Sequence, residues 1–294
     1  MKTSRAMYQP TTVEDAVALL AEAGEEGRVL AGGATLVALM NARLVTPRCL
    51  VSLQAIDELR ELSRAADGSV RIGAMRRHRQ TAFESDLQAG HQVVSKAAAQ
   101  IANPPVRNMG TIGGSLGFAD PAADYPTALV AANAELELAG PAGRRRLPIA
   151  DYLLGWYETA LEPGEIITAV LLPAPQPGSV GHYEKLCRVS GDFALAAIAV
   201  VMTKADDGAL SAVRVAVGGC GGAPVRVEEA ENVLVAGQLD DASVKRAGEL
   251  LQAALDPVDD VRASAQYRIQ VVPRLLRRAL DRIVDRSTQV AGAS

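Results

Sequence analysis

The sequence predicts an α+β protein in which a two-part module precedes a smaller C-terminal domain. Apolar residues occur at both helical and strand spacing along the first 175 positions. A proline-rich stretch follows at 173–179, as is typical of a linker. Beyond it, a block of strands precedes a block of helices, an order typical of an α+β domain.

The first part of the module, residues 1–55, is predicted to form a small β-α-β-α-β unit. Thr12 has an acidic residue three positions later, a pattern that marks the start of a helix. The elements expected after this start are a helix at 13–23, a strand at 28–31, a helix from Leu36 to Met40 and a strand at 49–53.

The second part, residues 56–175, is predicted to mix strands with short helices. Asn103-Pro104-Pro105 should end a helix, because proline cannot continue one. The expected elements are strands at 70–74, 134–138 and 165–172, and helices at 79–88 and 91–101. A further helix is expected to open within Asp120–Pro126 and to run to about Ala132.

The C-terminal domain, residues 180–288, is predicted to combine a three-stranded antiparallel sheet with helices. Its strand runs are joined by short turns, which favours a meander. The expected elements are strands at 181–189, 194–203 and 213–217, followed by helices at 226–236, 242–255 and 265–286.

Composition excludes several classes of protein. The net charge of −4 disfavours a nucleic-acid-binding protein, which usually carries a basic surplus. The chain has three cysteines that lie far apart, Cys49, Cys187 and Cys220, so no self-contained iron–sulfur or zinc site is expected. The cysteines are expected to be reduced thiols. The chain shows no signal peptide at 1–5 and no membrane span, which predicts a cytoplasmic protein.

Two glycine-rich stretches are the strongest functional signal. The stretches 30–36 and 109–117 each place glycines beside a small hydroxyl residue. Consecutive N–H groups without a neighbouring Cβ can bind a phosphate, especially where a helix begins, as at Leu36. Two such turns in one chain suggest a ligand with two phosphates, such as a dinucleotide. A plain connector between strand and helix is the alternative for Gly32-Gly33.

The other polar candidates are less specific. The glycine cluster at 218–222 lacks a full dinucleotide-binding pattern and is predicted to be a tight connector. Asp124 either accepts hydrogen bonds from a ligand or caps a helix. Lys185, Arg188 and Asp192 are either exposed strand-edge charges or groups that tune a flavin. His78 lies among arginines, which predicts a solvated segment, and no histidine has metal-ligand spacing.

Five stretches in register resemble the FAD-binding medium subunit of the molybdenum hydroxylases, the family that includes xanthine dehydrogenase and carbon monoxide dehydrogenase. The resemblance covers nearly the whole chain. The matching stretches are Ala31–Leu36, Asn108–Ser115, Asp120–Asp124, Leu161–Ile167 and Lys185–Ala194. The family often has a larger polar residue where Ala34 stands, Ser or Asp where Thr35 stands, and Asn where Ser115 stands.

The resemblance implies a two-part FAD-binding module of the vanillyl-alcohol-oxidase (PCMH) type, with FAD between the parts. Around the diphosphate it places Leu30, Ala31, Gly32, Gly33, Ala34, Thr35 and Leu36 on one side, and Gly110, Thr111, Gly114, Ser115 and Gly117 on the other. Around the flavin and ribityl groups it places Ile101, Ala102, Asp124, Ile166, Ile167, Lys185, Asp192 and Phe193.

The resemblance also implies an electron-transfer role without substrate chemistry in this chain. A large subunit would carry a molybdopterin-type cofactor, and a small subunit would carry two-iron iron–sulfur clusters. The FAD of this chain would pass electrons to an external acceptor, in a dimer of heterotrimers. Two alternatives remain open: a stand-alone FAD-dependent oxidoreductase, and an assembly subunit that has lost FAD. The organic substrate and the electron acceptor are not encoded in recognisable motifs.

Overall fold

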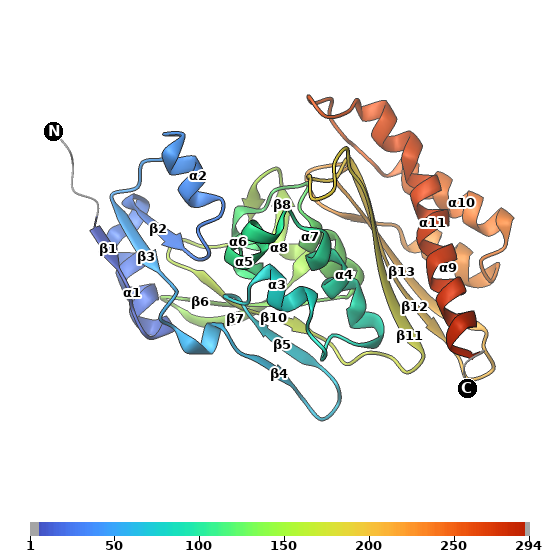
Figure 1. Ribbon diagram of the computed structural model, residues 1–294, viewed down its shortest axis with the longest axis horizontal. Helices are drawn as coiled ribbons and strands as arrows, with labels where there is room; N and C mark the ends of the chain where they lie inside the picture. Colours follow the sequence, from blue (N-terminus) through green and yellow to red (C-terminus); the bar gives the residue numbers. More distant parts are fainter. Residues whose placement is uncertain (1–5, 292–294) are drawn as a thin grey trace.

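The computed structural model describes the backbone of residues 6–291 and the side chains of residues 6–285. The predicted absence of a signal peptide at residues 1–5 therefore lies outside the described residues. The molecule is elongated, with the N-terminal sheet at one end and the C-terminal helices at the other (Figure 1). Within residues 6–291, no helix has the length and apolar character needed to cross a bilayer.

The N-terminal part forms a three-stranded parallel sheet of order β1-β3-β2, as expected for a β-α-β-α-β unit. Thr12 accepts a hydrogen bond from the Asp15 N–H at 3.1 Å, which caps the first helix. The elements are β1 (Ala6–Tyr8), α1 (Val13–Ala23), β2 (Gly27–Leu30), α2 (Leu36–Asn41) and β3 (Cys49–Ser52).

The middle part is built on a five-stranded antiparallel sheet of order β4-β5-β10-β6-β7. Its strands are β4 (Leu62–Arg64), β5 (Val70–Gly73), β6 (Glu135–Gly140), β7 (Gly143–Pro148) and β10 (Ile166–Leu172). Its helices are α3 (His78–Ala82), α4 (Gln92–Gln100), α5 (Pro104–Met109), α6 (Ile112–Phe118), α7 (Asp124–Ala131) and α8 (Ile149–Tyr152). A separate two-stranded ribbon pairs β8 (Leu153–Gly155) with β9 (Glu158–Thr159).

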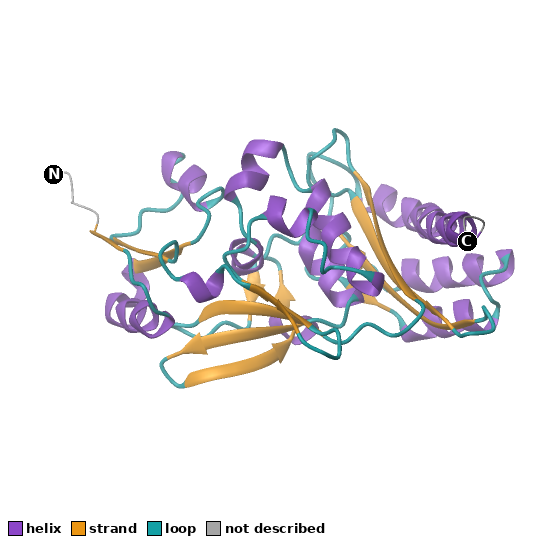
Figure 2. Ribbon diagram, turned by 60° about the horizontal axis from the view of Figure 1, so that its bottom comes forward, coloured by secondary structure: helices purple, strands orange, loops and turns teal. Residues whose placement is uncertain are grey.

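The C-terminal part is a four-stranded antiparallel sheet of order β11-β12-β13-β14 with helices packed on one face. Figure 2 shows this sheet between the helices of the middle part and the C-terminal helices. The elements are β11 (Ser179–Leu186), β12 (Ala196–Lys204), β13 (Leu210–Gly218), β14 (Val225–Arg226), α9 (Glu228–Ala236), α10 (Asp241–Ala253) and α11 (Ala265–Ala291).

The hydrophobic cores explain how the three parts are held together. Along β12, Ala197 and Ala199 face the core of the middle part, whereas Ile198 and Val200 face the core under α9–α11. This division follows from the alternation of side chains along a strand. Ile166 of β10 completes the core beneath α1 of the N-terminal part. Neighbouring parts therefore share buried apolar surface.

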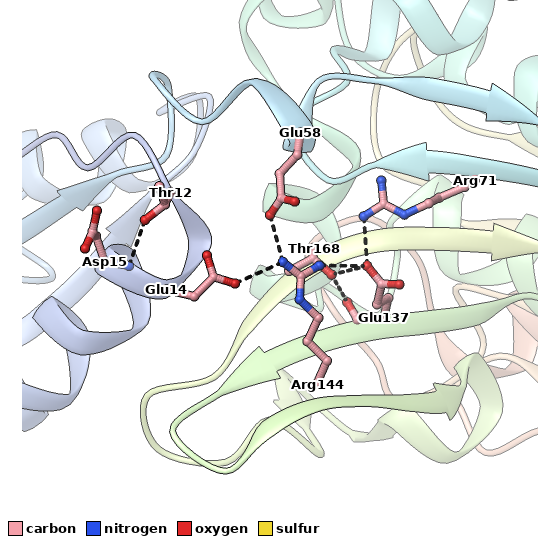
Figure 3. Close-up of polar contacts among 8 residues, drawn as sticks. All are labelled: Thr12, Glu14, Asp15, Glu58, Arg71, Glu137, Arg144 and Thr168. Carbon is pink, nitrogen blue, oxygen red and sulfur yellow. Dashed lines mark hydrogen bonds and ion pairs between the residues drawn. The ribbon is translucent and has the colours of Figure 1, made fainter.

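An ion-pair network also joins the N-terminal and middle parts (Figure 3). Arg144 of β7 lies 3.3 Å from Glu14 of α1, 3.0 Å from Glu58 and 3.5 Å from Glu137. Burial disfavours the charge of Glu137, but hydrogen bonds from Arg71 and Thr168 hold its pKa below the usual value. The exposed pairs with Glu14 and Glu58 contribute little to stability, because solvent screens their charges.

The structure corrects several expected elements. The helix expected at 79–88 spans only His78–Ala82, because the chain turns back and Glu84 pairs with Arg76. Asn103-Pro104-Pro105 starts α5 as well as ending α4, since proline suits the first turn of a helix. The C-terminal sheet has the short strand β14 in addition to the three expected strands. Strands β4, β7, β8 and β9 and helix α8 had no predicted counterpart, and the first strand of the expected β-α-β-α-β unit had not been assigned to residues.

Candidate functional site

The first glycine stretch is a loop between β2 and α2 with unpaired backbone donors. In the described part of the chain, no hydrogen bond is donated by the N–H groups of Gly32, Gly33, Ala34 and Thr35. Gly33 has a φ of 78°, a left-handed conformation that glycine adopts without strain. The loop is partly to fully exposed, so its N–H groups can meet an anionic ligand.

The second glycine stretch is helical, which corrects the expectation of an open turn. Thr111 caps α6 by accepting a hydrogen bond from the Gly114 N–H at 3.1 Å. The Ile112 and Gly113 N–H groups donate to the carbonyls of Arg76 and Ala74 at 3.0 and 2.8 Å. The start of α6 therefore supplies a side-chain-free wall, and most of its N–H groups are already bonded within the protein.

The two stretches lie against each other. A Cβ at Gly32 would overlap the Met109 carbonyl, so only glycine allows this approach. A Cβ at Gly114 would lie 2.9 Å from Thr111 Oγ1 and 3.4 Å from the Ala31 Cβ. One turn further along α6, a Cβ at Gly117 would lie 3.9 Å from Ile167 Cδ1. Gly114 and Gly117 thus face the first loop and β10, with little protein filling the space beside them.

Ile166 and Ile167 do not share this surface. Ile167 belongs to the core of the middle part beside α6, whereas Ile166 packs in the core beneath α1. Successive strand residues point to opposite faces. The structure therefore places only Ile167 near the glycine stretches.

His78 is buried, which corrects the expectation of a solvated segment. Its side chain packs on Gly110, where a Cβ would overlap the imidazole, and its Nδ1 lies 3.3 Å from the Tyr125 hydroxyl. Burial, with a smaller contribution from the Arg107 charge, lowers the pKa of His78 to about 4. The imidazole is therefore neutral at pH 7 and supports the segment that enters α6.

We expect the free energy of unfolding to fall by about 2 kcal/mol through His78 between pH 6.5 and 5. In that range the unfolded imidazole binds a proton and the folded one, with a pKa of about 4, does not. Urea unfolding of the wild type and of His78→Gln at both pH values measures this difference. An identical pH dependence in the two proteins would contradict the assignment.

A buried polar cluster joins the middle part to the C-terminal sheet. Lys185 Nζ lies 2.9 Å from Asp124 Oδ1, and the Tyr183 hydroxyl donates to the same oxygen at 2.7 Å. Burial raises the pKa of Asp124, against the opposing effects of Lys185 and Tyr183. Lys185 also donates to the Gln100 carbonyl at 2.8 Å. Lys185 is therefore buried and is not an exposed strand-edge charge. Asp124 is the first residue of α7, whereas the N-cap of that helix is Ala123.

The loop after β11 lies against the segment that follows α4. A Cβ at Gly191 would overlap the Ala102 carbonyl, which brings the loop next to Ile101 and Ala102. Asp192 and Phe193 are exposed on this loop, and the Arg262 guanidinium lies 5.2 Å from the centre of the Phe193 ring. These contacts assemble a second group of expected site residues: Ile101, Ala102, Asp124, Lys185, Asp192 and Phe193.

Three residues near the site escaped the sequence analysis. Tyr183 and Arg262 contact expected site residues, and Arg107 donates to the carbonyls of Ile101 and Ala102 at 2.7 and 2.6 Å. Arg107 lies one residue before the matching stretch Asn108–Ser115, and its contact with the preceding segment depends on the direction of α5. The glycine cluster at 218–222 packs instead on Thr127 and Trp156.

The site fits a dinucleotide in its donors and its shape. Four adjacent unpaired N–H groups at 32–35 match the acceptor oxygens of a diphosphate. The bare face of α6 at Gly114 and Gly117 leaves room opposite them. The segment that contains Ala102 immediately precedes α5, and α5 connects this segment to α6. Within the described residues, no cluster of His, Cys, Asp and Glu side chains could hold a metal ion.

Two family models match this chain and together cover most of it. The model described as the FAD binding domain in molybdopterin dehydrogenase matches residues 2–175. The model described as the CO dehydrogenase flavoprotein C-terminal domain matches residues 181–283.

Individual proteins resemble the chain over nearly its whole length. The carbon monoxide dehydrogenase medium chain of Afipia carboxidovorans is 39% identical over 275 residues, covering 94% of this chain and 95% of that protein. The 6-hydroxypseudooxynicotine dehydrogenase complex subunit alpha of Paenarthrobacter nicotinovorans is 35% identical over 276 residues, covering 94% and 93%. A structure of reconstituted CO dehydrogenase from Oligotropha carboxidovorans matches with a TM-score of 0.90 and 38% identity, covering 95% of this chain and 97% of that chain.

Proposed function

Because the chain belongs to the family of FAD-binding medium subunits of molybdenum hydroxylases, we propose that it binds FAD at the two glycine stretches and acts in electron transfer. The observation that best supports this proposal is the loop at 32–35, whose unpaired N–H groups lie beside the glycine face of α6. When bound, FAD would accept electrons from a partner iron–sulfur subunit and deliver them to an external acceptor.

Each group of site residues has a distinct proposed role. The loop from Leu30 to Leu36 holds the diphosphate through its N–H groups, and the Thr35 hydroxyl adds a donor. Thr111, Ser115 and the glycines at 110, 114 and 117 form the opposite wall. The flavin is bordered by Ile101, Ala102, Ile167 and Phe193. Lys185, Asp124 and Asp192 supply charge there, and the position of Ile166 supports only an indirect role beneath β10.

The proposed assembly follows from the family. The chain acts with a large subunit that carries a molybdopterin-type cofactor and a small subunit that carries two-iron iron–sulfur clusters, in a cytoplasmic dimer of heterotrimers. The proposed domain boundaries are 1–55, 56–175 and 180–288. The three larger of the four sheets fall one in each of these ranges, apart from Ser179 at the start of β11.

We expect the purified chain, after incubation with FAD and gel filtration, to show the absorbance of oxidised flavin. Heat denaturation should release FAD in about equal amount to protein, because the cofactor is bound without a covalent bond. Absorbance and chromatography of the released cofactor measure this. A chain that stays colourless in excess FAD would refute the proposal and favour the assembly subunit.

A second experiment distinguishes a subunit from a stand-alone oxidoreductase. Purification of the tagged chain from its native cells should yield two further polypeptides, with molybdenum and iron in the complex. A chain that purifies alone and turns over substrate by itself would favour the stand-alone enzyme.

A further inference from the structure

Three successive carbonyl groups at the end of α4 each accept a hydrogen bond from a cationic side chain. Lys185 Nζ donates to the Gln100 carbonyl at 2.8 Å. Arg107 Nη1 donates to the Ile101 and Ala102 carbonyls at 2.7 and 2.6 Å. The last carbonyls of a helix have no partner within it, and cations are favourable at that end. Lys185 therefore satisfies the last carbonyl of α4, and Arg107 satisfies the two carbonyls that follow the helix.

Arg107 can reach these carbonyls because α5 begins immediately after them. The Asn103 side chain accepts a hydrogen bond from the Val106 N–H at 3.1 Å, and prolines occupy the first turn. Asn103 and the prolines fix where α5 starts and its direction. Arg107 lies one turn along α5, and its partly buried side chain folds back over residues 101 and 102.

The segment that Arg107 holds has an unfavourable backbone conformation. Ala102 has a φ of 43°, in the left-handed region that residues with a Cβ rarely adopt. Such a conformation persists where the surroundings enforce it. The Ala102 carbonyl accepts a hydrogen bond from the Arg107 guanidinium. The same carbonyl lies against Gly191, where no side chain could fit. Without the arginine, this carbonyl would lose its charged partner.

We propose that Arg107 is a positioning residue that holds the segment 100–102 in the conformation that borders the flavin, and that its charge offsets the carbonyl dipoles there. The inference rests on the proposed function, which places Ile101 and Ala102 beside the flavin. Reduced flavin carries more negative charge than oxidised flavin. Without Arg107, the carbonyl groups of Ile101 and Ala102 would lack a cationic partner and would therefore disfavour reduction.

The test uses the full-length chain, with FAD itself as the probe. We expect Arg107→Gln to raise the dissociation constant of FAD about tenfold or more, since hydrogen bonds to charged groups are among the stronger ones in proteins. The visible absorption bands of bound FAD should move, and its reduction potential should become more negative. Arg107→Lys keeps the charge but not the planar fork, so it should restore the potential in part.

Arg79→Gln is the matched control, because it removes the same charge from an exposed site on the neighbouring α3. It should leave FAD affinity, spectrum and potential unchanged. If Arg107→Gln fails to fold, Arg107→Lys alone should still weaken FAD binding and move the spectrum. An Arg107 variant with the affinity, spectrum and potential of the wild type overturns the role of Arg107 alone. A wild type that binds no FAD overturns the proposed function instead.

Discussion

Gly114→Val is expected to leave the chain folded but almost without FAD. The added Cβ would lie 3.4 Å from the Ala31 Cβ and 2.9 Å from Thr111 Oγ1, so the two γ-methyl groups must enter the space between α6 and the first loop. Overpacking of this kind costs about 1–3 kcal/mol even where the structure can adjust. Because the diphosphate is proposed to occupy that space, we expect the substitution mainly to weaken FAD binding. The ratio of FAD to protein after gel filtration measures the loss.

Gly155→Val provides the matched control for this substitution. The space around Gly155 is open, since the nearest atom to an added Cβ is a carboxylate oxygen of Glu158 at 3.9 Å. This variant should keep the FAD content of the wild type. If Gly114→Val also kept full FAD content, the proposed location of the diphosphate would be wrong.

Lys185→Met is expected to produce the largest loss of stability. It removes one partner of a buried ion pair and leaves Asp124 with the Tyr183 hydroxyl as its remaining side-chain donor. Removal of one partner of a buried pair typically costs about 3–5 kcal/mol. Burial already raises the pKa of Asp124, and loss of the ammonium raises it further. The stability deficit should therefore grow as the pH rises above the ordinary range of an aspartate, where the unfolded carboxyl ionises.

Urea unfolding followed by circular dichroism, at several pH values, measures this loss. Lys245→Met, at an exposed position of α10, removes the same charge and should change stability by less than about 0.5 kcal/mol. The double variant Lys185→Met with Asp124→Asn should recover part of the loss, because no buried charge remains. Equal stability of Lys185→Met and the wild type would contradict a coupled pair.

The sequence analysis predicted the longer elements well because their signals are local. Val13–Ala23 carries apolar residues at helical spacing behind a capping threonine, and β12 is a continuous apolar run. Shorter elements lack such signals. The strand β7 carries Arg144, Arg145 and Arg146 and is defined by its pairing with β6, so its formation depends on another segment of the chain. The same holds for β4, a short edge strand that pairs with β5.

The helix α6 shows why the second glycine stretch was misjudged. Glycine is a poor helix former, so four glycines within eight residues predict a turn. In the fold, Thr111 caps the helix and a Cβ at Gly113 would clash with Ala74 at 2.6 Å. The glycines therefore allow α6 to pack closely on the sheet, and this packing outweighs their low helix propensity.

The order of motifs along the chain was sufficient to identify the family, because each motif is contiguous and can be recognised without a fold. Five stretches in register are far more specific than either glycine stretch alone. The sequence also predicted an anion site at the first loop, since adjacent residues supply its N–H groups. The burial of Lys185 beside Asp124 and the return of Arg107 onto the carbonyls of 101 and 102 depend on how separate segments pack. Such contacts join residues that are distant in the chain or depend on helix direction, and no local pattern encodes them.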